Sequence, residues 1–276
     1  MAVLTVACVQ TNAGPEIDAN LATEAGLIRQ ARDAGADLIA LPENAALMEP
    51  RRAKLLQKAE PEDGHRALAA FRDLAVETGA WLLIGSLAVR LAGDKIANRG
   101  YLITPAGQVA AHYDKIHMFD VTLPSGESYR ESSTFAAGGR SVVAATPWGG
   151  LGMTICYDLR FAALYRALAE AGAELLAVPS AFTRTTGRAH WHVLLRARAI
   201  ETGCFVIAPA QCGTHAEGRQ TYGHSLIVDP WGEVLADAGE EVGFVTARID
   251  TDRVADVRAM VPALAHGRPI PPPEQC

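Results

Sequence analysis

The segment from Gly152 to Phe161 constrains this chain more than any other, because an apolar strand passes directly into a helix there. Cys156 lies at the junction. A side chain at such a turn projects beyond the sheet, and the backbone N–H groups that follow point the same way. The junction therefore predicts an α/β fold that presents a thiol beside an anion-binding hole. Cysteine is commonly a small buried apolar residue. The polar pair Tyr157–Asp158 directly after Cys156 breaks the apolar run, so the local sequence alone fits a nucleophile and a buried residue at Cys156 equally well.

Strands and helices alternate along most of the chain. An amphipathic helix at 18–34 ends at Gly35, a residue typical of helix ends. The pattern predicts strands at 3–10, 37–42, 81–89, 99–104 and 108–113, and further helices at 65–78 and 189–202. His224 is expected to begin a later strand. Between 116 and 140 the periodicity disappears, and a loop of that length inside a compact domain is usually functional.

A weak internal repeat accompanies this alternation. Ala34–Glu43 recurs as Ala171–Ser180, each time after a helix. The likeness is either chance or the mark of two α/β halves that stack with their helices outside. No linker separates the halves, so we expect one domain over residues 1–261. Residues 262–276 hold five prolines and are expected to form an extended arm on this subunit or on a partner.

Composition narrows the class of protein. With 276 residues, 49% of them hydrophobic, the chain can bury a large core. Its 25 basic and 31 acidic side chains give a net charge of -6, which argues against nucleic acid or an anionic membrane as a partner. No apolar run is long enough to span a bilayer, and the start lacks the basic region of a signal peptide.

Cysteine usage and motif content bear on compartment and cofactors. Five dispersed cysteines without a CxxC pair indicate neither a disulfide framework nor a zinc site, so a cytoplasmic location fits best. The sequence has no glycine-rich phosphate loop and no metal-ligand cluster. We therefore expect no cofactor and no metal, and a small molecule as the partner.

A thiol needs a base or a nearby positive charge to attack at neutral pH, because its pKa is about 8.5. None of the eight histidines sits in a recognisable cysteine-protease signature. Glu43 follows a buried strand, where burial is expected to raise its pKa toward that of a working base. The alternative is a capping or surface glutamate. Lys115 ends another strand and is either a solvated charge or a stabiliser of a thiolate and an oxyanion.

The three residues occur in motifs whose order is informative. Glu43 in Leu-Pro-Glu-Asn, Lys115 in Tyr-Asp-Lys-Ile-His and Cys156 in Ile-Cys-Tyr-Asp-Leu-Arg-Phe resemble the Glu-Lys-Cys triad of the nitrilase (carbon–nitrogen hydrolase) superfamily. The resemblance covers essentially the whole chain. Its further motifs are Pro179–Phe182, Ala189–Trp191, Leu195–Glu201, Tyr222–Ser225 and Val228–Gly232. Each motif alone is weak, but the ordered set is strong.

The resemblance implies a four-layer αββα sandwich, usually paired into a homodimer or a higher homo-oligomer, that hydrolyses amides. By this analogy Glu43 deprotonates Cys156, and Lys115 with the backbone N–H of Tyr157 holds the oxyanion. Ammonia leaves, a thioester remains on the cysteine, and a water activated by Glu43 releases the acid.

The resemblance also extends to further site residues. The family keeps a second glutamate near the lysine, which we carry over to Glu131, with Glu127 as the competing candidate. Phe182 and Thr183 are expected to contact the substrate. Arg160, just after the turn, is placed to bind the carboxylate of a 2-oxo acid in a bidentate manner.

Two branches of the superfamily compete for the substrate. One hydrolyses deaminated glutathione; the other, omega-amidase, acts on alpha-ketoglutaramate and alpha-ketosuccinamate. Segments 196–204 and 210–215 look closer to the first branch. We therefore expect hydrolysis of the terminal amide of deaminated glutathione to the acid plus ammonia, with omega-amidase or another small-amide hydrolase as the alternative. Arg188 stands where these enzymes usually have proline, which leaves the substrate length open.

Two other classes of protein remain alternatives. An acyltransferase that passes the thioester to an amine or a lipid would need membrane access or an acceptor pocket. A non-enzymatic interaction protein on the same scaffold is disfavoured, because all three triad positions are intact.

Overall fold

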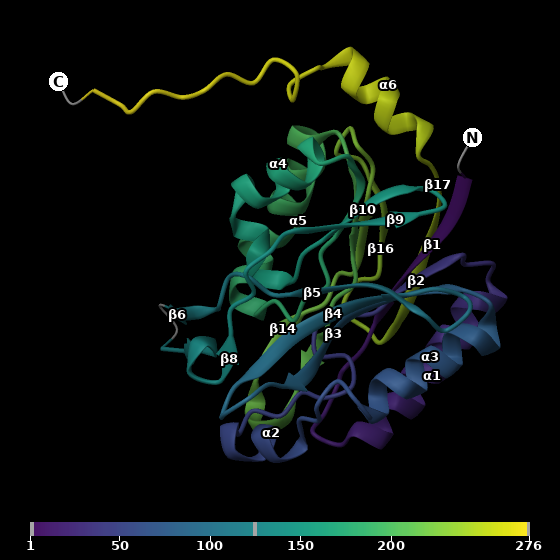
Figure 1. Ribbon diagram of the computed structural model, residues 1–276, viewed down its shortest axis with the longest axis vertical. Coiled ribbons are helices and arrows are strands. Elements are labelled where there is room, and N and C mark those ends of the chain that lie inside the picture. Colours follow the sequence, from purple (N-terminus) through teal and green to yellow (C-terminus); the bar gives the residue numbers. More distant parts are fainter. Residues whose placement is uncertain (1–2, 124–125, 275–276) are drawn as a thin grey trace.

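Two β-sheets lie face to face at the centre of the structure, and helices cover the outer face of each (Figure 1). The structure is a computed structural model that describes residues 3–123 and 126–274. The layers follow the order helix, sheet, sheet, helix, so the expected four-layer αββα sandwich is confirmed.

The first sheet is 7-stranded, in the order β17-β1-β2-β3-β4-β5, with β8 paired to β4. Strands β1, β2 and β3 are parallel, and the strands beside them are antiparallel to their neighbours. Helices α1 and α3 cover its outer face. The bounds are β1 (Val3–Gln10), β2 (Leu38–Ala40), β3 (Trp81–Arg90), β4 (Ile96–Ile103), β5 (Val109–Asp114), β8 (Phe135–Ala136), β17 (Gly243–Asp250), α1 (Ile17–Asp33) and α3 (Arg66–Thr78).

The second sheet is 6-stranded, in the order β16-β15-β12-β11-β10-β9. Its strands β10, β11 and β12 are parallel, and helices α4 and α5 cover its outer face. The bounds are β9 (Val142–Thr146), β10 (Gly149–Met153), β11 (Ala173–Ala177), β12 (Phe205–Ala208), β15 (Leu226–Val228), β16 (Val234–Asp237), α4 (Ala162–Glu170) and α5 (Arg184–Thr202). Shorter elements are α2 (Arg52–Lys58), β6 (Asp120–Thr122), β7 (Ser128–Arg130), β13 (Cys212–Thr214), β14 (Gln220–Tyr222), α6 (Asp252–Met260) and the 3-10 turns η1 (Glu131–Ser133), η2 (Cys156–Arg160) and η3 (Ala216–Gly218).

The first strand shows how the sequence builds two cores at once. Successive side chains of a strand point to opposite faces of its sheet. Val6 and Cys8 accordingly join the core between the two sheets, whereas Ala7 and Val9 pack under α1 and α3. Full burial of an aliphatic side chain such as valine contributes roughly 1.5–3 kcal/mol, so both faces of this strand fix its register.

The two repeated segments occupy equivalent places. Each contains a short strand between two parallel neighbours, β2 in one sheet and β11 in the other, followed by a proline. Strand β3 passes close to both strand ends at Gly85, where an added Cβ would lie 2.3 Å from the Leu41 carbonyl oxygen and 2.4 Å from the Pro179 Cβ. Glycine therefore lets the two halves approach each other beside Glu43.

The helix expected at 189–202 in fact begins at Arg184. Its additional first turn buries Thr186 and Gly187, which carry no apolar signal. The expected loop at 116–140 contains the β6–β7 hairpin, the η1 turn and β8. These strands are mostly exposed, so their sequence shows no alternation. His224 does not begin a strand; it lies between β14 and β15 with a φ of 54°.

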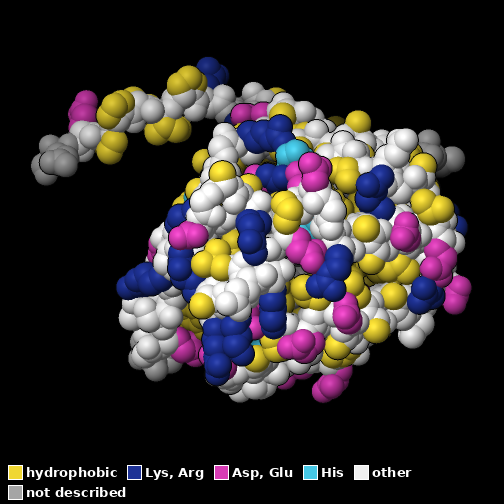
Figure 2. Space-filling model, turned by 60° about the horizontal axis from the view of Figure 1, so that its bottom comes forward, with side chains coloured by type: hydrophobic (Ala, Val, Ile, Leu, Met, Phe, Trp, Pro, Cys, Tyr) yellow, Lys and Arg dark blue, Asp and Glu magenta, His cyan; other side chains and the backbone are white. Residues whose placement is uncertain are grey.

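Residues 265–274 are exposed and lead away from the body of the molecule (Figures 1 and 2). The start of the expected arm is a turn, in which the His266 N–H donates to the Pro262 carbonyl oxygen at 3.0 Å. The extended arm over 262–276 and its contact with a partner stay predictions, and Gln275 and Cys276 lie outside the described residues. On the face shown in Figure 2, basic and acidic side chains are interspersed. Within the described part of the chain, no helix has the length and apolar character needed to cross a membrane.

Candidate active site

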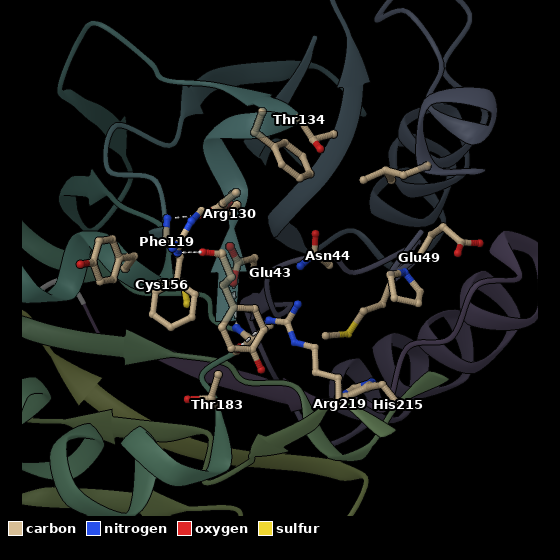
Figure 3. Close-up of a pocket in the computed structure, with 18 of the residues that line it drawn as sticks. Glu43, Asn44, Glu49, Phe119, Arg130, Thr134, Cys156, Thr183, His215 and Arg219 are labelled. Atoms are coloured by element: carbon tan, nitrogen blue, oxygen red, sulfur yellow. Dashed lines mark hydrogen bonds between the residues drawn. The ribbon is translucent and has the colours of Figure 1, made fainter. Parts of the chain in front are cut away.

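Cys156 lies at the turn between the second sheet and a helix. β10 ends at Met153, the 3-10 turn η2 begins at Cys156, and α4 follows from Ala162. The expected passage from strand to helix therefore exists, with a tight 3-10 turn before the α-helix. Cys156 has a φ of 50°, a left-handed conformation that is uncommon and costly for non-glycine residues and recurs at active sites. Its thiol lines a cavity of about 340 Å³ (Figure 3).

A buried carboxylate fixes this turn to the neighbouring segment of the first sheet. One Asp158 oxygen accepts hydrogen bonds from the Ile155 N–H (2.9 Å) and the Tyr113 hydroxyl (2.8 Å). The other accepts the His117 backbone N–H at 3.0 Å and lies 2.7 Å from the His117 Nδ1. Because Tyr113 and His117 flank Lys115 in the chain, Asp158 aligns the lysine with the thiol turn. This contact explains why the two motifs carry a tyrosine, a histidine and an aspartate.

Glu43 is placed by the end of β2 and is 3% exposed. Its Oε1 accepts hydrogen bonds from the Lys115 Nζ at 2.8 Å and from the Asn98 Nδ2 at 2.9 Å. Its Oε2 accepts the Ala181 N–H at 2.9 Å. Its side chain and the Cys156 thiol line the same cavity. The carboxylate is thus held from both sheets and faces the thiol.

Lys115 is 2% exposed and lies between two carboxylates. Besides Glu43, its Nζ contacts both oxygens of Glu131, at 2.9 and 3.0 Å. Burial lowers the pKa of Lys115, but the charges of Glu131 and Glu43 outweigh it and raise the pKa above its usual range. The side chain is therefore a permanent ammonium. Glu127, the competing candidate, is exposed and accepts a hydrogen bond from Tyr129, so Glu131 is the glutamate beside the lysine.

The pKa of Glu43 is shifted in the opposite direction to the rise expected from the sequence. Burial does raise it, but the charge and hydrogen bond of Lys115 and a hydrogen bond with Cys156 outweigh burial and lower the pKa below its ordinary value. Burial and the charge of Glu43 raise the pKa of Cys156 well above its usual range, against the opposing charge of Lys115. The resting site therefore holds an ionised carboxylate beside a protonated thiol.

Asn98 and Arg219 belong to this site although the sequence did not indicate them. Asn98 comes from β4 and also donates to Glu131, at 3.2 Å. Asn98 precedes the strand expected at 99–104 and is followed by Arg99, so no apolar pattern singled it out. Arg219 follows η3 and donates to the Ala181 carbonyl oxygen at 3.1 Å. Its Nε is buried and has no hydrogen-bond partner among the described residues, and its guanidinium lies 5.5 Å from the Tyr129 ring centre.

The walls of the cavity divide into polar and apolar parts (Figure 3). Glu43, Lys115, Glu131 and Cys156 all line it, as do the predicted substrate contacts Tyr157, Phe182 and Thr183. The apolar part is formed by Leu47, Met48, Pro50, Leu55, Phe119 and Phe135. Pockets that bind small molecules are typically of this kind, mostly apolar with a few placed polar groups.

Two arginines singled out from the sequence lie elsewhere. Arg160 is not among the described residues that line the cavity; its guanidinium lies 5.0 Å from the Phe182 ring centre and 3.2 Å from the His190 Nδ1. Its contact with a substrate carboxylate therefore stays a prediction. Arg188 is exposed on α5 and is also outside the described lining, so nothing places it against a substrate.

Comparison with known proteins gives a consistent result. Residues 5–259 match the model of the family described as carbon-nitrogen hydrolase. The chain is 44% identical to a deaminated glutathione amidase of Synechocystis, over 94% of this chain and 96% of that protein. It superposes on the NitFhit protein of C. elegans with a TM-score of 0.91 and 35% identity, covering 97% of this chain and 66% of that one.

A third relative is informative about chemistry. The amidase from Nesterenkonia has a solved structure of a Glu-to-Gln mutant that shows covalent addition of the acetamide moiety of fluoroacetamide at its active-site cysteine. This structure aligns with a TM-score of 0.79 and 26% identity, covering 94% of this chain and 95% of that one.

Proposed function

Because the chain belongs to the carbon–nitrogen hydrolase family, we propose that it cleaves the amide of a 2-oxo acid through a thioester on Cys156. The observation that carries the proposal is the meeting of a thiol, a carboxylate and an ammonium, from distant parts of the chain, in one cavity. The adduct on the active-site cysteine of the Nesterenkonia amidase supports the same role for Cys156.

Acylation begins with the protonated thiol. As the Cys156 Sγ forms a bond to the amide carbon, its proton passes to the Glu43 carboxylate, and the carbonyl oxygen becomes an oxyanion. Glu43 then gives the proton to the amide nitrogen, the C–N bond breaks, and the amine leaves with a thioester remaining on the sulfur. General acid–base catalysis of this kind is worth about 10²–10⁴-fold in rate. The low pKa of Glu43 keeps it ready to accept the proton at neutral pH.

The oxyanion is stabilised by Lys115 and by the backbone N–H of Tyr157. An ammonium carries three N–H donors, and the two contacts of Lys115 with Glu131 can share one of them. A donor is then free for the substrate. Tyr157 is the second residue of the η2 turn, where N–H groups have no acceptor inside the turn. Loss of one such oxyanion donor typically costs about 3–4 kcal/mol in the transition state.

Deacylation repeats the proton transfers with water. Glu43 takes a proton from a water molecule as the oxygen of that water attacks the thioester carbon. The C–S bond then breaks, the proton returns to Cys156, and the acid is released. Glu131 balances the charge of Lys115, so that Glu43 is free to act as the base.

We propose deaminated glutathione as the substrate, with alpha-ketoglutaramate as the second candidate. The identity of 44% to a deaminated glutathione amidase supports the first. Loss of the amino group leaves the γ-amide of glutathione intact, so the amine that departs from this substrate is cysteinylglycine. Ammonia departs only from a primary amide such as alpha-ketoglutaramate. The ammonia expected from the sequence therefore applies to the second candidate.

Both candidates deliver the same 2-oxoglutaryl group to the sulfur. They differ only in the leaving group, so selectivity must arise in the acylation step. The apolar wall that includes Leu47, Met48 and Leu55 offers a surface for a dipeptide leaving group but nothing that ammonia needs. This wall supports the larger substrate.

Both candidates also carry a carboxylate, which requires a fixed cation. Arg219 lines the cavity and has a buried Nε–H without a partner, so it is the better-placed guanidinium. An unpaired buried donor is costly, and a substrate carboxylate would satisfy it. Arg160 is the alternative, and an unchanged KM for a 2-oxo amide in Arg160→Lys would eliminate it.

The deciding experiment compares kcat/KM for the two candidates by following 2-oxoglutarate, their common product. We expect deaminated glutathione to be preferred by more than about tenfold, a difference of roughly 1.4 kcal/mol. A comparable preference for alpha-ketoglutaramate would identify an omega-amidase instead.

We also propose a homodimer in a reducing compartment such as the cytoplasm. Val193 and Ile200 lie seven residues apart on α5, both more than half exposed, and Trp231 is 54% exposed. Apolar side chains grouped in this way favour contact with a second copy. The four described cysteines are free thiols, which supports the reducing compartment.

A further inference from the structure

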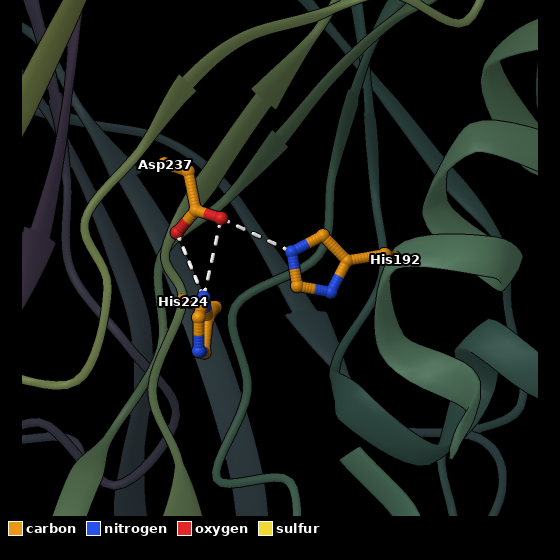
Figure 4. Close-up of side chains that lie close together, drawn as sticks. All are labelled: His192, His224 and Asp237. Atoms are coloured by element: carbon orange, nitrogen blue, oxygen red, sulfur yellow. Dashed lines mark hydrogen bonds and ion pairs between the residues drawn. The ribbon is translucent and has the colours of Figure 1, made fainter. Parts of the chain in front are cut away.

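A second group of reactive side chains lies on the outer side of the second sheet (Figure 4). His192 from α5, His224 from the segment before β15 and Asp237 at the end of β16 point toward one another. The His192 Nε2 is 3.1 Å from one Asp237 oxygen, and the His224 Nδ1 is 2.9 Å from the other. Their three candidate ligand atoms all lie within 4.8 Å of one another. Sequence reasoning did not connect these residues, because 45 positions separate the first from the last in the chain.

The distances suit a metal ion as well as hydrogen bonds. Zinc binds imidazole nitrogens and carboxylate oxygens at about 2.0–2.2 Å in a tetrahedral arrangement, which separates neighbouring ligands by about 3.3 Å. The Asp237 Oδ2 lies 3.1 Å from the His192 Nε2 and 3.2 Å from the His224 Nδ1, so both distances to this oxygen already suit one shared ion. The three ligand atoms lie within 4.8 Å of one another, and an ion would draw the two imidazole nitrogens together by side-chain rotation. Imidazole nitrogens and carboxylate oxygens are also ligand types that zinc binds in proteins.

The three side chains are held in place by contacts of their own. The Trp191 Nε1 donates to the His224 carbonyl oxygen at 2.8 Å, and the His224 ring is stacked on Tyr222 with centroids 4.4 Å apart. The Gly239 N–H donates to Asp237 at 2.9 Å. His224 adopts its left-handed φ of 54° within this frame. Backbone strain at a non-glycine residue persists where surrounding structure enforces it, and commonly at functional sites.

The side chains are also accessible. The exposed fractions are 34% for His192, 34% for Asp237 and 21% for His224. An ion bound here can enter from solvent and keep water as a fourth ligand, an arrangement known for zinc with three protein ligands.

We propose that His192, His224 and Asp237 form a binding site for a divalent transition-metal ion, with Zn²⁺ as the best match to this ligand set. The site is separate from the cavity of Cys156 and does not depend on the amide chemistry. A bound ion would connect α5 to the segment that runs from β14 to β16 and includes Tyr222 and Asp237. That segment supports the cavity wall, because the Tyr222 N–H donates to the Phe182 carbonyl oxygen at 2.9 Å.

The test measures Zn²⁺ binding by equilibrium dialysis of chelator-treated protein in the Cys156→Ala background, which removes the active-site thiol as a competing ligand. We expect one saturable equivalent of Zn²⁺, and an affinity at least about tenfold lower after His192→Ala. His190→Ala is the matched control, since His190 lies on the same helix but contacts Arg160 rather than the cluster. It should bind Zn²⁺ as its parent does.

Two further readouts keep the test independent of folding defects. Asp237→Asn preserves the side-chain volume but removes the charge, and it should weaken binding as His192→Ala does. Zn²⁺ should raise the Tm of the Cys156→Ala protein and leave that of the folded His192→Ala double variant unchanged. The absence of saturable binding, or equal affinities in the His192→Ala and His190→Ala proteins, would overturn the proposal.

Discussion

Replacing Glu43 with glutamine removes the proposed base while preserving its shape. Glu43 uses both oxygens as acceptors, Oε2 for the Ala181 N–H and Oε1 for Lys115 and Asn98. A glutamine has one oxygen, so its NH₂ group must face a donor on one side. An unsatisfied buried donor costs about 1–3 kcal/mol, and we expect the free energy of unfolding to fall by about that amount.

The effect on catalysis should be larger. Loss of a general base typically costs about 10²–10⁴-fold in rate, which is about 2.7–5.4 kcal/mol at 1.36 kcal/mol per tenfold. The thiol itself should change in the opposite sense. The charge of Glu43 helps to raise the pKa of Cys156, whereas Lys115 lowers it. Glu43→Gln should therefore make the thiol ionise at a lower pH while making the enzyme slower.

The assay combines steady-state release of 2-oxoglutarate with the pH dependence of Cys156 alkylation by iodoacetamide. Glu127→Gln is the matched control, because Glu127 is exposed and contacts Tyr129 rather than the triad. Glu43→Asp keeps the charge and should retain more activity than Glu43→Gln. A folded Glu43→Gln protein with kcat/KM within tenfold of the parent would show that Glu43 is not the base.

Three further predictions concern substrate binding, pH and packing. Arg219→Lys should raise KM for a 2-oxo amide at least about tenfold with kcat nearly unchanged, because one ammonium cannot replace a bidentate guanidinium; an equal rise for an amide that lacks a carboxylate would contradict this role. The kcat/KM should be constant between about pH 6 and 8 and fall only in acid. The reason is that the depressed pKa of Glu43 keeps its carboxylate ionised until the pH falls through that pKa. A midpoint near neutrality in the pH–rate profile would exclude Glu43 as the group that titrates. Gly85→Ala should lower the free energy of unfolding by about 1–3 kcal/mol, because the added Cβ would overlap backbone and Pro179 atoms. Chemical denaturation measures this change. An unchanged midpoint would show that β3 can move away.

The fold followed from the sequence where burial on both faces shaped the pattern. Strand β1 was predicted at its exact bounds, because Val6 and Cys8 must face one core and Ala7 and Val9 the other. The first turn of α5 was missed, since its buried positions are Thr186 and Gly187. Small and polar residues that pack against a neighbour leave no periodic signal.

The candidate site was likewise predictable from the sequence only in part. Their positions after strands marked Glu43, Lys115 and Cys156 as candidates, but the residues alone left a surface glutamate, a solvated lysine and a buried cysteine open. Only the resemblance of their three motifs to the nitrilase superfamily joined them into a triad. The pKa of Glu43 was predicted in the wrong direction, because its sign depends on the ammonium of Lys115, which is brought to it by tertiary structure. Arg219 lies in an irregular segment after η3, so only the folded chain reveals its unpaired Nε.

Rapid-quench mass spectrometry of the enzyme mixed with deaminated glutathione tests the central claim most directly. We expect a transient 2-oxoglutaryl adduct on the peptide that contains Cys156, which forms before free 2-oxoglutarate builds up and is the same with alpha-ketoglutaramate. Turnover without any adduct on that peptide, or turnover that persists in Cys156→Ala, would contradict it.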